Sequence, residues 1–132
     1  AEASVEASRV FNAQLIDAGR MEVLHGSVED LPFSDGIFDK AVTVESFYFW
    51  PNPAENLKEV ARILRPGGTF LLLAEIYGKE DLSAHVRESV AKYDLFNPTP
   101  EEFRQLFSDA GFREVYLHFA DGKEWIAVLG ER

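Results

Sequence analysis

Residues 38–76 read FDKAVTVESFYFWPNPAENLKEVARILRPGGTFLLLAEI, and this stretch decides the fold. Its first part, 38–44, is a short apolar run of the kind that forms a strand buried on both faces. Asn52 can cap a helix, Pro53 suits its first position and Glu55 its third. Apolar residues then recur at the spacing of an amphipathic helix: Leu57, Val60, Ala61 and Leu64. The last part, 69–76, is a second apolar strand, so the order strand, helix, strand predicts parallel strands with the helix packed on their sheet.

The sequence on both sides continues this alternation. Further elements are expected at these places: a helix over 2–18, a strand over 21–25, helices over 82–93 and 99–110, and strands over 113–119 and 123–129. Gly19 suits a left-handed helix cap, Thr99 to Glu102 forms a capping box, and Asp121-Gly122 is a hairpin signal. We therefore expect one α/β domain over 1–132, with a mostly parallel sheet and an antiparallel strand at its C-terminal edge.

Composition and charge exclude several classes of protein. The chain has 23 acidic against 13 basic residues, a net charge of −10, and no Lys/Arg cluster, which argues against nucleic acid as a partner. It has no cysteine, which excludes disulfides, thiolate zinc sites and a cysteine nucleophile, and three scattered histidines do not make a metal site. No apolar run is long enough to span a bilayer and no signal peptide is visible, so we expect a cytoplasmic protein.

Two loops are candidates for chemistry, because ligands bind at the carboxyl ends of strands in an open α/β sheet. One loop spans 25–33 and the other spans 45–52.

Three stretches carry motifs in a fixed order: 23–39 (VLHGSVEDLPFSDGIFD), 59–70 (EVARILRPGGTF) and 110–112 (AGF). They resemble, in turn, G-D-A-x-x-L-P-F-x-D-x-x-F-D, E-x-x-R-V-L-(R/K)-P-G-G-x-(F/L) and A-G-F of class I S-adenosylmethionine-dependent methyltransferases of the small-molecule and quinone methylating kind. The resemblance covers nearly the whole chain. It implies a Rossmann-like sheet, S-adenosylmethionine as the cofactor, and a small-molecule methyl acceptor.

The same resemblance assigns the loop after the third family strand to the adenine ring. Ser27 and Val28 should flank the ring, with the Val28 N–H bonding a ring nitrogen. The family usually has an acid at the Ser27 position, and Glu29 is expected to compensate for its absence.

The second loop is assigned to the methyl-transfer side. Glu45 and Ser46 should lie under the methionine part of the cofactor or along the methyl-transfer path. Four aromatic residues are expected to wall the substrate side: Phe47, Tyr48, Phe49 and Trp50. No catalytic residue is assigned, because a sulfonium methyl is already electrophilic and the protein mainly has to hold the reactants in line.

The glycine-rich turn of the family is not found in the sequence, which contains no G-x-G. In the family strand order 3-2-1-4-5-7-6, the chain would lack strands one and two, and we expect a truncated, inactive fragment with little cofactor affinity. The third and fourth family strands would then have open edges. Self-association into a homo-oligomer such as a dimer, or direct pairing of 21–25 with 38–44, would cover them.

Two functional classes remain open. One is a methyltransferase, and the other is a non-catalytic Rossmann-like interaction or regulatory module. A nicotinamide-dependent oxidoreductase shares the layered fold, but the L-P-F and R-P-G-G signatures argue against it.

Overall fold

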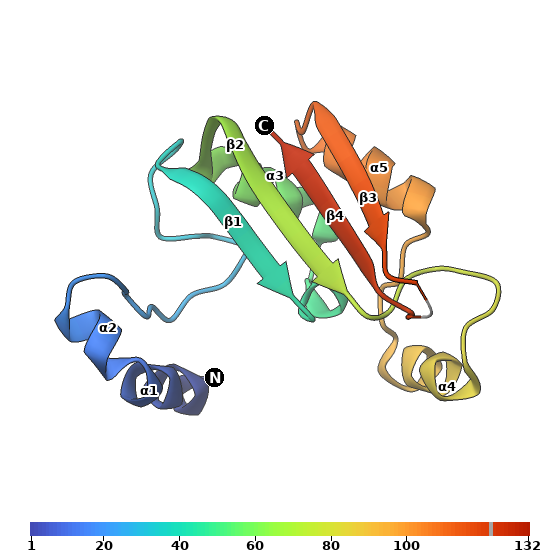
Figure 1. Ribbon diagram of the computed structural model, residues 1–132, viewed down its shortest axis with the longest axis horizontal. Coiled ribbons are helices and arrows are strands. Elements are labelled where there is room, and N and C mark those ends of the chain that lie inside the picture. Colours follow the sequence, from blue (N-terminus) through green and yellow to red (C-terminus); the bar gives the residue numbers. More distant parts are fainter. Residues whose placement is uncertain (122) are drawn as a thin grey trace.

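The structure, a computed structural model, describes residues 1–121 and 123–132. Helices and strands follow one another along the chain, as Figure 1 shows. Their bounds are α1 (Glu2–Phe11), α2 (Ala13–Asp17), β1 (Phe38–Val44), the 3-10 helix η1 (Phe47–Phe49), α3 (Pro53–Ile63), β2 (Leu64–Ala74), α4 (Ala84–Tyr93), α5 (Pro100–Asp109), β3 (Glu114–Phe119) and β4 (Ile126–Glu131).

The sheet has four strands in the order β1-β2-β4-β3. β1 and β2 are parallel and α3 connects them, which confirms the interpretation of residues 38–76. β4 is antiparallel to both of its neighbours, β2 and β3. The antiparallel strand therefore lies inside the sheet, where the family strand order has strand seven, and not at the C-terminal edge, where the hairpin pattern led us to expect it. In this inner place, both of its backbone edges are hydrogen-bonded.

The expected strand over 21–25 does not form. These residues are outside every strand of the described chain, and β1 lies at the edge of the sheet with β2 as its neighbour. The expected pairing of 21–25 with 38–44 is therefore wrong. An extended segment becomes a strand only when a partner satisfies its backbone groups, and apolar patterning cannot supply that partner.

The N-terminal helix is divided in two at Asn12. The side-chain amide of Asn12 donates to the carbonyl of Ser8 at 2.8 Å, and the backbone there leaves the helical conformation. Gly19 has φ +66°, which confirms the predicted left-handed position. Figure 1 shows α1 and α2 to one side of β1, and of these two helices only Val5 is buried.

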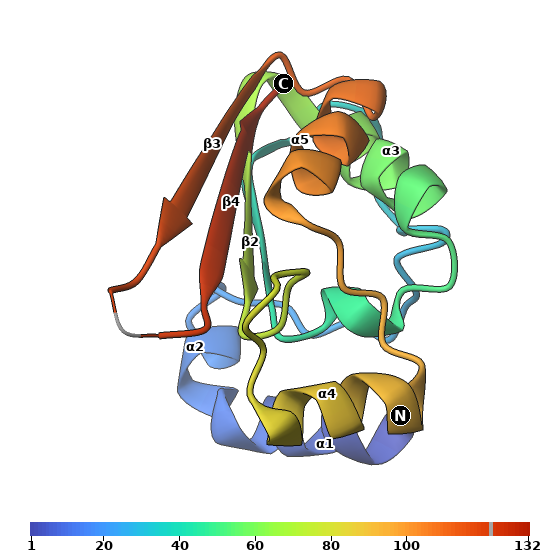
Figure 2. The ribbon, with the colours of Figure 1, turned by 90° about the vertical axis from the view of Figure 1, so that its right-hand side faces the viewer.

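The core lies between the sheet and the pair α3 and α5, which cover the same face (Figure 2). The two helices contribute side chains three or four residues apart and the inner strands contribute alternate ones: Leu57 and Val60 from α3, Phe103 and Phe107 from α5, Phe70 and Leu72 from β2, and Ile126 and Val128 from β4. Burying one such side chain contributes about 1.5–3 kcal/mol. On the opposite face of β1, Val42 and Val44 are exposed.

The structure tests three local signals of the sequence: the capping box, the start of α3, and the turn before the last strand. The capping box is confirmed, since Thr99 and Glu102 bond each other's backbone N–H. The third helix does start at Pro53, but the Asn52 side chain does not cap it. The last strand starts at Ile126 and not at 123, because Phe119 pairs with Ile126. A hairpin does form, with the connection running over 120–125, of which Gly122 lies outside the described residues.

Candidate functional site

The carboxyl ends of β1 and β2 meet at one edge of the sheet, because the two strands are parallel. Glu45 follows β1 directly and has φ +54°, a left-handed backbone that is uncommon for a residue with a side chain. Such conformations are held by their surroundings and gather at functional sites. The turn directs the chain from β1 into η1.

Residues 27–29 form a small polar unit within the first candidate loop. The Ser27 hydroxyl donates to Glu29 Oε2 at 3.1 Å, and the Glu29 N–H donates to Ser27 Oγ at 3.3 Å. The Glu29 carboxylate therefore lies beside the serine that stands at the family's acidic position. Ser27 and Val28 line a cleft of about 310 Å³ together with Leu24 and Leu31.

A second cleft, of about 290 Å³, brings the two candidate loops together. Val28 and Leu31 line it from the first loop, and Ser46 and Trp50 line it from the second. Ser46 is held there by a hydrogen bond between its hydroxyl and that of Thr43 on β1. Val28 borders both clefts, so the structure places one predicted adenine residue next to two predicted residues of the methyl-transfer side.

Glu45 and Tyr48 connect the end of β1 to the end of β2. The Tyr48 hydroxyl lies 3.0 Å from both carboxylate oxygens of Glu45, to which it donates. The same phenol oxygen accepts the N–H groups of Glu75 at 2.7 Å and Ile76 at 3.1 Å. Glu45 Oε1 also accepts the Glu75 N–H, at 2.6 Å. Both side chains are thus engaged with the backbone that leaves β2.

The Tyr48 phenol is neutral at ordinary pH. Burial, above all, raises its pKa to about 12; the Ile76 N–H bond acts against this rise, and the neighbouring Glu45 carboxylate adds to it. A neutral phenol that donates to a carboxylate is not a general base. Tyr48 serves the site as a fixed hydrogen-bonding group.

The four aromatic residues take four different positions. Phe47 is fully buried, and its ring centroid lies 5.1 Å from that of Trp50 and 5.5 Å from that of Phe103. Tyr48 makes the bridge just described, and Phe49 points outward with two thirds of its surface exposed (67%). Trp50 borders both the 290 Å³ cleft and another of about 500 Å³ under residues 94–98. A substrate wall built from these residues stays a prediction; Phe47 would support such a wall from inside the core.

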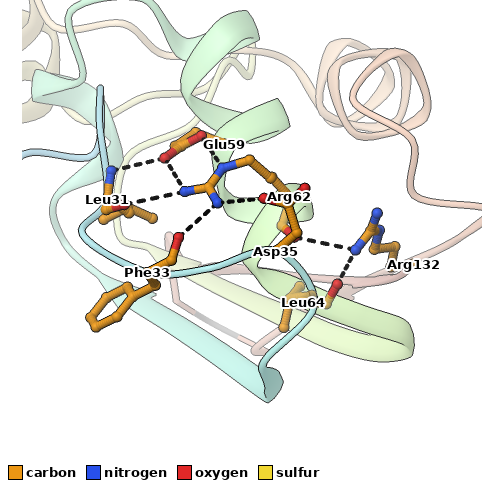
Figure 3. A network of polar contacts seen from close by, with 7 residues as sticks. All are labelled: Leu31, Phe33, Asp35, Glu59, Arg62, Leu64 and Arg132. Carbon is orange, nitrogen blue, oxygen red and sulfur yellow. Dashed lines mark hydrogen bonds and ion pairs between the residues drawn. The ribbon is translucent and has the colours of Figure 1, made fainter.

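Glu59 and Arg62 are the residues that sequence reasoning missed, although both belong to the E-x-x-R motif. Figure 3 shows their side chains on α3 reaching the first candidate loop. Glu59 accepts the Leu31 N–H at 2.8 Å, and Arg62 donates to the Phe33 carbonyl at 2.7 Å. The spacing of the motif was the only signal in the sequence, and it carries no information about the distant loop.

Comparison with known proteins agrees with this arrangement. A family model described as a methyltransferase domain matches residues 1–72, which is more than half of the chain. The chain is 35% identical over 95 residues to 2-methyl-6-phytyl-1,4-hydroquinone methyltransferase 2, chloroplastic, of Oryza sativa subsp. japonica, a match that covers 72% of the chain and 26% of that protein. The chain thus spans about a quarter of the length of this relative.

Solved structures share the fold. A methyltransferase of Thermotoga maritima, S-adenosylmethionine-dependent and described as a possible histamine N-methyltransferase, matches with a TM-score of 0.67 and 25% identity over 90% of this chain and 68% of its own. Geranyl diphosphate methyltransferase in complex with S-adenosylmethionine matches at 0.77 and 15% identity, over 100% of this chain and 66% of its own. The predicted Rossmann-like sheet with its C-terminal hairpin is confirmed. The chain belongs to the methyltransferase domain family, among the class I S-adenosylmethionine-dependent enzymes.

Proposed function

We propose that the full-length protein containing this chain transfers the methyl group of S-adenosylmethionine to a small-molecule acceptor. The observation that carries this proposal is the cleft shared by Val28, Ser46 and Trp50, which brings the two motif-bearing loops together beside β1 and α3. The relatives described above are methyltransferases, so the enzyme is preferred to the non-catalytic module.

The first loop is proposed to bind the adenine ring. Val28 and Leu31 offer apolar surface on the cleft that Ser27 also lines. The Glu29 carboxylate, placed beside Ser27 by the 3.1 Å hydrogen bond, offers the acceptor that an exocyclic amino group needs. These residues fit the group, because apolar side chains line the cleft and the Glu29 carboxylate is bonded to Ser27, which lines it as well.

The second loop is proposed to serve the methyl-transfer side. When bound, the cofactor supplies an electrophilic methyl group on a sulfonium. Ser46 borders the shared cleft, and Glu45 shapes the loop through its left-handed backbone and its bonds to Tyr48. Trp50 presents an aromatic side chain to the cleft, which suits a neighbouring cation and excludes water. We assign substrate contact to Tyr48 and Trp50, with Phe47 behind them.

Three further assignments belong to the proposal. We treat the chain as one domain, place the protein in the cytoplasm, and exclude nucleic acid as a partner because of the net charge of −10. No helix in the described part of the chain is long and apolar enough to cross a membrane.

Self-association is proposed through the edge strand β1, where exposed Val42 and Val44 flank an open ladder. Size-exclusion chromatography with light scattering checks this proposal on the 132-residue chain itself, because the family's strands one and two would cover this edge in a complete domain. A clean monomer at all concentrations would contradict it, and a dimer that Val42→Lys dissociates would support it.

Mass-spectrometric detection of methyl transfer tests the function directly. The full-length protein is incubated with S-adenosylmethionine and a panel of small acceptors that includes hydroquinones, amines and carboxylates. We expect a mass increase of one methyl group on one class of acceptor, and a weaker cofactor affinity for Ser27→Ala and Glu29→Gln. Absence of any S-adenosylhomocysteine binding by calorimetry would refute the proposal.

A further inference from the structure

We propose that Glu59 and Arg62 are positioning residues that hold the 27–35 loop in the shape that binds the adenine half of the cofactor. They lie on α3, behind the loop, and act on cofactor affinity without contact with the cofactor. The role of Glu59 and Arg62 in cofactor binding rests on the proposed function, whereas their role in holding the loop does not.

Glu59 holds the middle of the loop through one carboxylate oxygen. Its Oε1 accepts the Leu31 N–H at 2.8 Å across 28 residues of sequence. The same carboxylate receives two parallel bonds from Arg62, Nε to Oε2 and Nη2 to Oε1, both at 2.7 Å. This bidentate pair fixes the plane of the carboxylate and thereby the direction from which Leu31 is held.

Arg62 holds the outgoing part of the loop with its other donors. Its Nη2 donates to the Leu31 carbonyl at 3.2 Å, and its Nη1 donates to the Phe33 carbonyl and to Asp35 Oδ1, both at 2.7 Å (Figure 3). One guanidinium therefore reaches three points of the loop and the carboxylate on its own helix. A lysine could not replace it, because an ammonium lacks the planar fork.

The loop depends on these contacts because it has little structure of its own. From residue 28 to residue 36 it contains no helix and no strand. Its internal backbone bonds join Ser27 to Asp30 and Leu31 to Phe33, and its internal side-chain bonds join Ser27 to Glu29. The contacts to Leu31 and Phe33 are also partly shielded from water, since the side chains of Glu59 and Arg62 are 16% and 30% exposed, whereas Asp35 lies at the surface. The Arg62 hydrogen bonds, first of all, lower the pKa of Glu59 to about 2, so the carboxylate stays charged at neutral pH.

An ordinary helix ion pair would not explain this geometry. Glu55 and Lys58 make such a pair one turn earlier on α3, at the same i,i+3 spacing and 2.7 Å, with side chains 60% and 52% exposed. Within the described residues, that pair makes no hydrogen bond to the loop. Lys58→Gln is therefore a matched control for loss of an ion pair on the same helix.

Hydrogen exchange of the full-length protein without cofactor tests the fastening. In Glu59→Ala and in Arg62→Lys, we expect amides of the loop, that of Leu31 above all, to exchange roughly tenfold faster or more, as loss of a charge-assisted bond requires. Amides of α5 should keep their rates. Glu59→Gln keeps an acceptor for the Leu31 N–H and should lie between wild type and Glu59→Ala. Unchanged exchange of the loop overturns the proposal.

Cofactor affinity tests the role at the site. We expect Arg62→Lys and Glu59→Ala to raise the Kd for S-adenosylhomocysteine and the KM for S-adenosylmethionine roughly tenfold, with kcat and the acceptor KM within about twofold of wild type. Lys58→Gln should leave all four unchanged. Equal effects of Lys58→Gln and Arg62→Lys, or a kcat that falls together with thermal stability, overturn the proposal. If the wild type binds no cofactor, the proposed function fails, while the exchange experiment still decides whether the loop is fastened.

Discussion

Replacing Tyr48 by phenylalanine removes one oxygen atom from the carboxyl edge of the sheet and keeps the buried ring. That oxygen donates to Glu45 and accepts the N–H groups of Glu75 and Ile76. The Glu75 N–H keeps its 2.6 Å bond to Glu45 Oε1, so only the Ile76 N–H loses its acceptor. The substitution therefore separates the hydrogen-bonding role of Tyr48 from its packing.

The size of the effect follows from these bonds. A hydrogen bond to a charged group contributes about 1.5–3 kcal/mol, and a backbone N–H left without its partner costs about 1 kcal/mol. We expect Tyr48→Phe to lower the free energy of unfolding by about 2.5–4 kcal/mol. A chain of this length has a stability of about 7–20 kcal/mol, so the loss should be plain in urea denaturation.

Unfolding free energies measured at alkaline pH test the role of the Tyr48 hydroxyl in a second way. Burial raises the pKa of Tyr48 to about 12, whereas an unfolded tyrosine ionises near pH 10. The stability that comes from the neutral phenol is fully present below pH ~10 and is lost as the pH rises to about 12. The difference in unfolding free energy between wild type and Tyr48→Phe should therefore shrink over that window.

The control is Tyr116→Phe, because Tyr116 lies half-exposed on β3 and has no side-chain hydrogen bond in the described chain. It should change stability by less than about 0.5 kcal/mol. Unfolding curves that show Tyr48→Phe no less stable than Tyr116→Phe would refute the reasoning. In the full-length protein, Tyr48→Phe should also weaken acceptor binding, because it removes the hydrogen bonds that join η1 to the end of β2.

Three further substitutions test other parts of the structure. Gly130→Ala would place a Cβ 2.7 Å from the ring of Phe107 and 2.9 Å from that of Phe112, and both rings are buried. We therefore expect urea denaturation to show an unfolding free energy lower by about 1–3 kcal/mol. A stability equal to wild type would show that the rings can move. Thr99→Ala removes a capping box and should cost about 1 kcal/mol, while an unchanged denaturation midpoint would contradict the cap. The Arg62 hydrogen bonds lower the pKa of Glu59 to about 2. The stability that the Glu59 carboxylate contributes is therefore present above pH ~4.5 and lost as the pH falls toward ~2. Acid denaturation of Glu59→Gln should lack this part of the pH dependence, and acid profiles identical to wild type would contradict the role of Glu59.

The sequence predicted the central β1, α3 and β2 closely. β1 has the expected bounds and α3 starts at Pro53 as expected, whereas β2 starts at Leu64, before the expected residue 69, and ends at Ala74. These elements were predictable because their signals are local: the apolar period, the proline at the first helical position and the glycines after the helix. The strand expected over 21–25 failed because a strand also needs a neighbour, and no local pattern names one.

In the candidate site, too, local sequence patterns predicted some features and contacts between distant segments decided the others. The structure brings Val28, Ser46 and Trp50 to one cleft, as ordered motifs on two neighbouring loops suggested. Phe47 could not be told from its aromatic neighbours by sequence, because its burial depends on rings from distant segments, those of Phe96 and Phe103.

By itself, the sequence determined the fold class, the family resemblance and the two loops at the carboxyl edge, since all three depend on short-range spacing. Only the tertiary structure decided that Glu45 and Tyr48 join two strands and that Arg62 holds a loop 27–31 residues away. Those contacts depend on which backbone groups remain unpaired after the sheet and helices form. That is a property of the folded chain as a whole and not of any stretch within it.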